Sequence, residues 1–139
     1  MIKDIVTDEA ILSQPCEPAT AADAEVAQDL VDTLLANEEA AALAANQIGV
    51  TKAIVAYLNE KDRPVVMYNP QITQALKPCP AVEACLSREE AAAVTRYKWI
   101  RVSYDVLLNG ELMPRKKKME GWQAQLVQHM IDHCNGELV

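Results

Sequence analysis

The sequence has no phenylalanine, and its tryptophans and tyrosines amount to only 4% of 139 residues. It has four glycines, two histidines and no repeat or low-complexity tract. Half of the chain is nevertheless hydrophobic, so its core must be built from Ala, Val, Leu, Ile and Met. This composition indicates one globular domain over residues 1–139, made of packed helices and modest strands.

Long apolar runs are also missing, because no stretch approaches the roughly 20 residues of a membrane span. The start of the chain, MIKD, lacks the charged and apolar regions of a signal peptide. We therefore expect a cytoplasmic protein without a membrane partner, whose four cysteines are thiols or metal ligands rather than a disulfide framework.

Positive charge is scarce, since the formal net charge is -7. Binding to nucleic acid requires clustered Lys and Arg, so the composition argues against a nucleic-acid partner. The one basic cluster, residues 115–118, indicates a solvated edge or loop.

Helical periodicity is clear in two segments. Apolar residues recur at helical spacing over residues 23–38, after possible capping side chains at 20–23, and a second helix begins near Met119 and ends at Asn135-Gly136. The alanine-rich segment 40–45 would extend the first helix by propensity alone.

Strand signals fill the middle of the chain. Residues 52–58 and 64–68 are short and rich in β-branched side chains, and Asn69-Pro70 is expected to end the second strand. Apolar and polar residues alternate up to Val106, and the Asn109-Gly110 turn predicts a hairpin that returns through residues 111–113. The fold class is therefore α+β.

Both histidines lie on the last helix. His129 and His133 are four residues apart, which puts two imidazoles on one face at a spacing that a single metal ion can bridge. A third ligand would be Cys, Asp or Glu from elsewhere, and Cys85 is one candidate. The alternative is a pair of ordinary helix-face residues. Trp122 and Leu126 continue the same stripe and are expected in the core.

Three ordered blocks of the sequence resemble those of peptide deformylases. AAALAANQ at 40–47 is similar to the family's G-x-G-L-A-A-x-Q, EACLS at 83–87 to E-G-C-L-S, and HMIDH at 129–133 to H-E-x-D-H. The resemblance spans essentially the whole chain. It implies a peptide-deformylase-like fold, with antiparallel or mixed sheets around a central metal-bearing helix, and a strand-like lip at 40–47 instead of a helix.

The resemblance also implies a reaction and its residues. Cys85, His129 and His133 match the family's ligands for one divalent ion, Fe²⁺ in the cell with Zn²⁺ or Ni²⁺ as substitutes, and water takes a fourth place. The partner is an N-formylated peptide or nascent chain, from which formate is released. The Gln47 amide and the backbone N–H of Leu86 match the donors to the oxyanion.

The second residue of the HMIDH block departs from the family pattern. Met130 stands where the resemblance implies a glutamate that acts as general base, and a thioether has no titratable proton. Loss of acid–base assistance typically lowers a rate about 10²- to 10⁴-fold. Rescue would have to come from Glu137, Glu83 or Asp132, but Glu83 is expected to pair with Arg96 and Asp132 to support the ligands.

Small residues depart from the pattern as well. Ala40, Ala42 and Ala84 replace family glycines, and Ala40, Ala42 and Leu43 match positions that border the substrate. Two functions follow. One is a metallohydrolase of N-formylmethionyl peptides, or of a related N-acyl substrate, with weak activity. The other is a non-catalytic relative that binds a metal or a peptide N-terminus.

Overall fold

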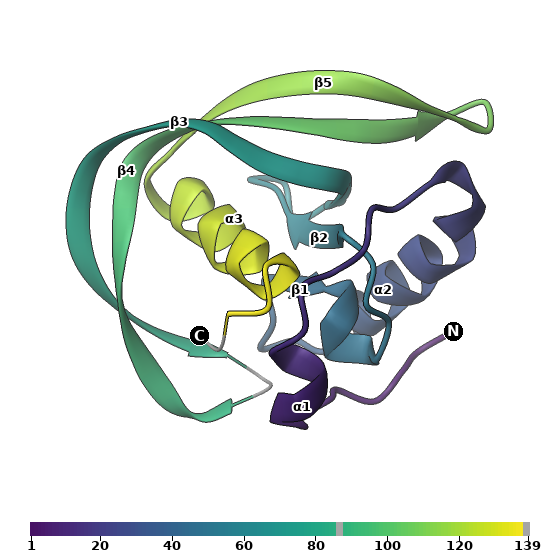
Figure 1. The fold of residues 1–139 in the computed structure, drawn as a ribbon, viewed down its shortest axis with the longest axis horizontal. Helices are drawn as coiled ribbons and strands as arrows, with labels where there is room; N and C mark the ends of the chain where they lie inside the picture. The colour runs from purple at the N-terminus through teal and green to yellow at the C-terminus, as the bar shows by residue number, and fades with distance from the viewer. Residues whose placement is uncertain (86–87, 138–139) are drawn as a thin grey trace.

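The computed structural model describes residues 1–85 and 88–137, without the side chains of 84, 85, 88–90 and 92. Five strands form one antiparallel sheet in chain order: β1 Ala42–Ala44, β2 Ile54–Leu58, β3 Pro64–Cys85, β4 Arg88–Leu108 and β5 Glu111–Glu120. The helical elements are α1 Glu9–Leu12, η1 Ala21–Asp23, α2 Ala24–Ala36, η2 Ala45–Ile48 and α3 Gly121–Cys134. The long strands β3 and β4 curve around α3, as Figure 1 shows. The predicted α+β class is confirmed.

The strands β1 and β2 are buried on both faces, and their side chains alternate between two cores. Ala42, Ala44, Val55 and Tyr57 belong to the cluster that includes buried residues of α3. The residues between them in the two strands, Leu43, Ile54 and Ala56, belong to a second cluster. That cluster also contains Leu30 and Leu34 of α2. The period of two therefore places β1 and β2 between the two longer helices.

The helix α2 confirms the predicted amphipathic helix and its start. Thr20 and Asp23 form a capping box at the turn η1 that leads into it. The helix ends at Ala36, so the extension through residues 40–45 expected from propensity is wrong. Ala42–Ala44 instead forms the strand β1, because pairing with β2 and burial on both faces outweigh the intrinsic preference of alanine. The strand-like lip that the resemblance implies for 40–47 is thus confirmed at Ala42–Ala44, whereas Ala45–Ile48 forms the 3-10 turn η2.

The strand β3 does not end at Asn69-Pro70, contrary to the prediction. The register shifts between Tyr68 and Gln71, and Asn69 adopts a positive φ of 52°. The Asn69 side chain accepts from the Ala19 N–H at 2.7 Å and donates to its carbonyl at 2.9 Å. A β-bulge therefore accommodates the proline, which has no N–H for the ladder, and the strand continues beyond it.

The predicted hairpin between β4 and β5 is confirmed. Its turn residues Asn109 and Gly110 have φ values of 52° and 78°, as a tight two-residue hairpin turn requires. β5 is longer than the expected return and forms the edge of the sheet. Its basic residues 115–118 are exposed, so they lie on a solvated edge as expected.

The last helix, α3, docks against β4 through Gln128. β5 pairs with β4 only as far as Trp99, and the Gln128 amide then bonds both the N–H and the carbonyl of Tyr97 at 2.8 Å. The helix ends at Asn135-Gly136 as predicted, with Gly136 at a φ of 77°. The core position expected for Trp122 is wrong, because its side chain is 64% exposed. No helix within residues 1–85 and 88–137 is long and apolar enough to cross a membrane.

Candidate active site

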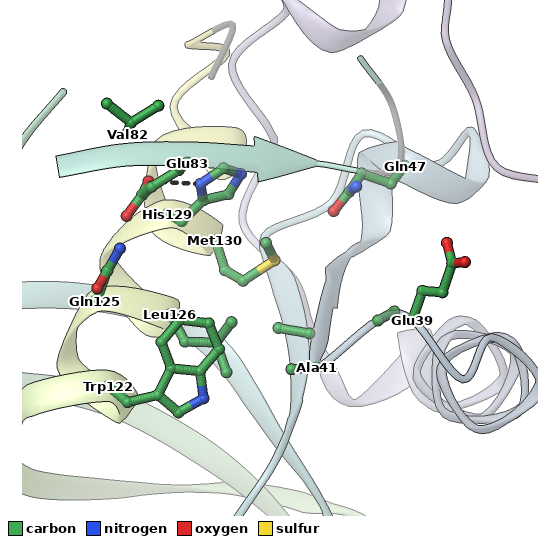
Figure 2. Close-up of a pocket in the computed structure, with 12 residues that line it drawn as sticks. Glu39, Ala41, Gln47, Val82, Glu83, Trp122, Gln125, Leu126, His129 and Met130 are labelled. Atoms are coloured by element: carbon green, nitrogen blue, oxygen red, sulfur yellow. Dashed lines mark hydrogen bonds and ion pairs between the residues drawn. The ribbon is translucent and has the colours of Figure 1, made fainter. Parts of the chain in front are cut away.

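A pocket of about 480 Å³ opens between the lip at β1, the end of β3 and one face of α3. Figure 2 shows the side chains around it, with Met130 directed into the space between α3 and the lip. Its lining residues come from four segments: Glu39, Ala40, Ala41, Ala42, Gln47, Val82, Glu83, Trp122, Gln125, Leu126, His129 and Met130. Most of the wall is apolar; Glu83, Gln125 and His129 supply polar groups on one side of it, and Gln47 and Glu39 lie on the other (Figure 2).

The two histidines lie side by side one turn apart on α3. Their ring centroids are 4.9 Å apart and their planes are inclined by 54°. Both residues are buried, and His129 is on the pocket wall. Asn46 donates to the backbone carbonyl of His133 at 2.8 Å, which ties η2 to the end of the helix.

A buried carboxylate orients His129. Glu83 Oε1 lies 2.7 Å from His129 Nδ1. The same carboxylate accepts hydrogen bonds from Nε and Nη2 of Arg96, whose Nη1 also donates to Asp132. The predicted Glu83–Arg96 pair is thus confirmed. Burial opposes ionisation of Glu83, but bonds from His129, Arg96 and Gln125 outweigh it and lower its pKa to about 2.

The ionised state of Glu83 fixes the tautomer of His129. A carboxylate only accepts, so Nδ1 of the ring carries the proton and donates it. Nε2 is then the ring nitrogen with the lone pair that a metal requires. A carboxylate behind a histidine in this way is the usual support of a metal-binding imidazole.

Gln47 is held rigidly at the opposite wall. Its side chain is fully buried, and its amide oxygen accepts from the Ala44 N–H at 2.9 Å. This bond fixes the oxygen toward the backbone of β1 and turns the N–H donors of the amide the other way. The donor role that the resemblance implies for Gln47 stays a prediction, which this orientation of the amide oxygen allows.

Met130 contributes its side chain to the pocket itself. It is only 4% exposed and packs in the same apolar cluster as Val127 and Ile131. The thioether makes this wall drier without adding a proton donor or acceptor of any strength.

The structure brings together some of the residues expected at the site. Ala40 and Ala42 line the pocket, whereas the Leu43 side chain is fully buried in the cluster that faces α2. Cys85 is in β3, but its side chain lies outside the described residues, and so does Leu86 with its backbone N–H.

The lining residues that were not singled out from the sequence as site residues include Glu39, Val82, Trp122 and Gln125. Gln125 precedes His129 by one helical turn, so periodicity alone could have placed it on the same face. The other three gave no usable signal, because an exposed Val or Trp beside a pocket has no sequence pattern of its own.

The donor set at this site fits a metal ion. Two imidazoles one turn apart face the same side of α3, and one of them has its tautomer fixed by Glu83. Among the described side chains, no group of three His, Cys, Asp or Glu could hold a metal ion. The third ligand implied by the resemblance, Cys85, is not among those side chains.

Solved structures with the same fold define the class first. A class I type b peptide deformylase from Acinetobacter baumannii, crystallised with Met-Ala-Ser, superposes with a TM-score of 0.85 and 25% identity over 99% of this chain and 97% of the other. The peptide deformylase from Thermus thermophilus superposes with a TM-score of 0.84 and 27% identity, over 99% of this chain and 83% of the other. A sheet wrapped around a histidine-bearing helix is thus the fold of peptide deformylases.

The sequence comparisons then assign the family. A family model described as Polypeptide deformylase matches residues 2–139. The peptide deformylase of Clostridium beijerinckii is 40% identical over 140 residues, which cover all of both chains. Peptide deformylase 1 of Bacillus subtilis is 31% identical over 99% of this chain and 87% of its own. The chain belongs to the polypeptide deformylase family, a class of metalloenzymes, which supports a divalent metal and a deformylase-like function.

Proposed function

We propose that this chain is a metal-dependent hydrolase that removes the formyl group from N-formylmethionyl peptides or a related N-acyl substrate, with low activity. The observation that carries the proposal is the buried pair of imidazoles on α3, of which His129 lies on the pocket wall and is oriented by Glu83. The peptide Met-Ala-Ser bound to the Acinetobacter baumannii relative supports a peptide ligand. Such a substrate is a nascent chain, so the proposal places the protein in the cytoplasm.

His129, His133 and Cys85 would hold the divalent ion, Fe²⁺ in the cell, with Zn²⁺ or Ni²⁺ as substitutes. When bound, the ion would supply Lewis acidity and make a water molecule nucleophilic near neutral pH. The ligand types alone do not select among these metals.

The chain's own residues position the substrate. The Gln47 amide donates to the substrate carbonyl oxygen as negative charge develops there, together with the backbone N–H of Leu86. Ala40 and Ala42 border the path of the peptide, and any contribution of Leu43 comes from its backbone, because its side chain lies in the α2 core. The apolar wall of Leu126 and Met130 accepts the first side chain of the peptide.

Proton transfer is the weak step. Met130 neither takes a proton from water nor delivers one to the leaving amine. The other carboxylates are poor substitutes: Glu83 has a pKa of about 2 and is bound to Arg96, and Asp132 bonds Arg96 as well. Hydrogen bonding to Asp132 raises the pKa of Glu137, but Glu137 is not among the residues that line the pocket.

Formate release from a formyl-Met-Ala-Ser peptide tests this proposal. The full chain, purified and loaded with Fe²⁺ without oxygen, is expected to release formate slowly but faster than a Cys85→Ala variant. Equal rates for the two proteins would contradict a hydrolytic function.

A non-catalytic binding module is the second candidate, favoured by Met130 on the pocket wall. In that case the protein would bind the formylated peptide and metal stoichiometrically without releasing formate. Calorimetric titration of the peptide into the metal-loaded chain, run beside the formate assay, separates the two functions. Metal below one equivalent after expression in metal-replete medium would count against both.

A further inference from the structure

The N-terminal segment around Cys16 is fixed against the last turn of α3. The backbone N–H of Cys16 donates to the carbonyl of Cys134 at 2.8 Å. Two residues further, Gly136 packs so closely that a Cβ there would lie 2.6 Å from the Ser13 carbonyl oxygen and 2.8 Å from Pro15 N. Two segments from opposite ends of the sequence are therefore held in one fixed register.

This register brings two thiols together. Cys16 and Cys134 are both free cysteines, and the neighbouring Cys134 thiol is the main cause of a lowered pKa at Cys16. The direct N–H···O=C bond brings the two backbones close to each other, and a disulfide bridges Cα atoms about 4.4–6.8 Å apart. We therefore expect the two sulfurs to join without a large backbone rearrangement.

The two thiols differ in access to solvent. Cys134 is buried, while Cys16 is half-buried and is the one that a small solute can reach. The hydrogen bond from Cys134 also lowers the pKa of the Cys16 thiol below its ordinary value, although burial opposes this. A reachable thiol beside a buried second thiol is the usual arrangement of an oxidisable pair.

We propose that Cys16 and Cys134 form a reversible oxidation site, which a peroxide converts into a disulfide. The Cys16 sulfur attacks one peroxide oxygen, the O–O bond breaks, and Cys16 becomes a sulfenic acid as the other oxygen leaves and becomes water. The Cys134 sulfur then attacks the sulfenic sulfur, an S–S bond forms, and a second water leaves with the Cys134 proton. Two thiols are oxidised by two electrons and one peroxide is reduced to two waters.

The disulfide would join the N-terminal segment to the end of the helix that carries both histidines. Because the closed loop contains most of the chain, it constrains the unfolded state strongly and raises the melting temperature. The site involves neither the pocket nor Cys85, so it stands or falls independently of the proposed hydrolytic function.

Peptide mapping after peroxide treatment tests the proposal. The full chain, loaded with Zn²⁺ because zinc has no redox chemistry, is treated with a few equivalents of hydrogen peroxide, alkylated and digested without reductant. We expect a linked pair of peptides containing Cys16 and Cys134, the loss of two hydrogens in the intact mass, and full reversal by dithiothreitol. The melting temperature of the oxidised protein should rise by several degrees.

Two single variants provide the comparison. Cys79→Ser removes another half-buried free cysteine and is expected to leave the linked peptides and the rise in melting temperature unchanged. Cys16→Ser is expected to abolish both. Three results would overturn the proposal: accumulation of sulfinic acid on Cys16 in the wild type without a linked peptide, linkage of Cys16 to Cys79 instead, or linked peptides without any rise in melting temperature.

Discussion

Met130 lies on the pocket wall next to His129, where its thioether offers no proton to a reaction. Replacing it by glutamate would add a titratable carboxylate at the position where the family motif has one. We expect Met130→Glu to raise formate release about 10²- to 10⁴-fold, because that is the usual contribution of general acid–base catalysis. Initial rates at equal metal occupancy measure the effect.

The matched control for this gain is Met130→Gln, which has the size and polarity of glutamate but no titratable proton. Its rate should remain near that of the wild type. An equal rise in both variants would show that pocket polarity limits the reaction. No rise in either would point to crowding by the methyl groups of Ala40 and Ala42.

Glu83 is expected to support metal binding through His129. Glu83→Gln keeps a side chain of the same shape but removes the charge that holds the Nδ1 proton, so Zn²⁺ affinity should fall about 10- to 100-fold. Competition with a chelator measures it. Asp132→Asn disturbs the same arginine without touching the imidazole, so its affinity should change far less. Equal losses would mean that the network acts only through stability.

Tyr57 predicts how stability depends on alkaline pH. Its side chain is fully buried, its hydroxyl has no hydrogen-bond partner among the described residues, and burial raises its pKa to about 12 from 10. Because folding raises the pKa of Tyr57, the neutral phenol contributes stability that is fully present below pH 10. This contribution is lost as the pH rises toward 12. Tyr57 should therefore cost up to about 1.4 kcal/mol of stability per pH unit in that range.

Denaturant unfolding of the wild type and Tyr57→Phe at pH 8 to 11 tests this expectation. The variant should be at least as stable at pH 8, because it removes a buried hydroxyl without a partner among the described residues. Its stability should decline less steeply above pH 10. Parallel curves for the two proteins would contradict the assignment.

Several site residues were predictable from the sequence because local spacing determines them. His129 and His133 are one helical turn apart whatever the surrounding fold. The Glu83–Arg96 pair was predicted differently, from the family position that Glu83 matches, and the structure contains it. Trp122 shares the same stripe but is exposed, since periodicity defines a face and not what covers it. A wide pocket leaves that end of the helix uncovered.

At the scale of the element, the end of α3 depends on Gly136. Gly136→Ala combines a positive φ of 77° with backbone atoms of Ser13–Pro15 at 2.6–2.8 Å from the new Cβ. We expect a loss of about 2–4 kcal/mol in the free energy of unfolding. Gly110→Ala has nearly the same φ, 78°, but open space around it, and should lose only about 1 kcal/mol.

The difference between these two glycine variants isolates the contact between the N-terminal segment and α3. Urea titration of both variants measures their free energies of unfolding. The dependence of that free energy on urea concentration should match that of the wild type. Equal losses would mean that only the positive φ matters at Gly136, and that the N-terminal segment can move away from the new Cβ without a loss of stability.

Elements were predicted well where one periodicity dominates and poorly where tertiary contacts decide. The helix α2 and the hairpin at Asn109-Gly110 follow from amphipathic spacing and turn chemistry. The alanines of β1 fit a helix equally well, and only pairing with β2 makes them a strand. At Asn69-Pro70 the turn signal is real, but hydrogen bonds to Ala19 turn it into a bulge inside β3.

At the scale of the whole molecule, the site is assembled from three separate parts of the sequence. The lip at β1 supplies Gln47 from the turn that follows it, the end of β3 supplies Glu83, and α3 supplies His129 (Figure 2) together with His133 one turn further on. No local pattern predicts that these parts meet. Their meeting follows from the curvature of β3 and β4 around α3 (Figure 1).

X-ray absorption at the zinc edge of the Zn²⁺-loaded full chain tests the central claim most directly. Two imidazoles and one thiolate should appear as nitrogen scatterers at about 2.0–2.1 Å and one sulfur at about 2.3 Å. The sulfur should disappear in Cys85→Ser and remain in Cys134→Ser. A bound zinc surrounded by oxygen alone, or by more than one sulfur, would contradict a centre formed by Cys85, His129 and His133.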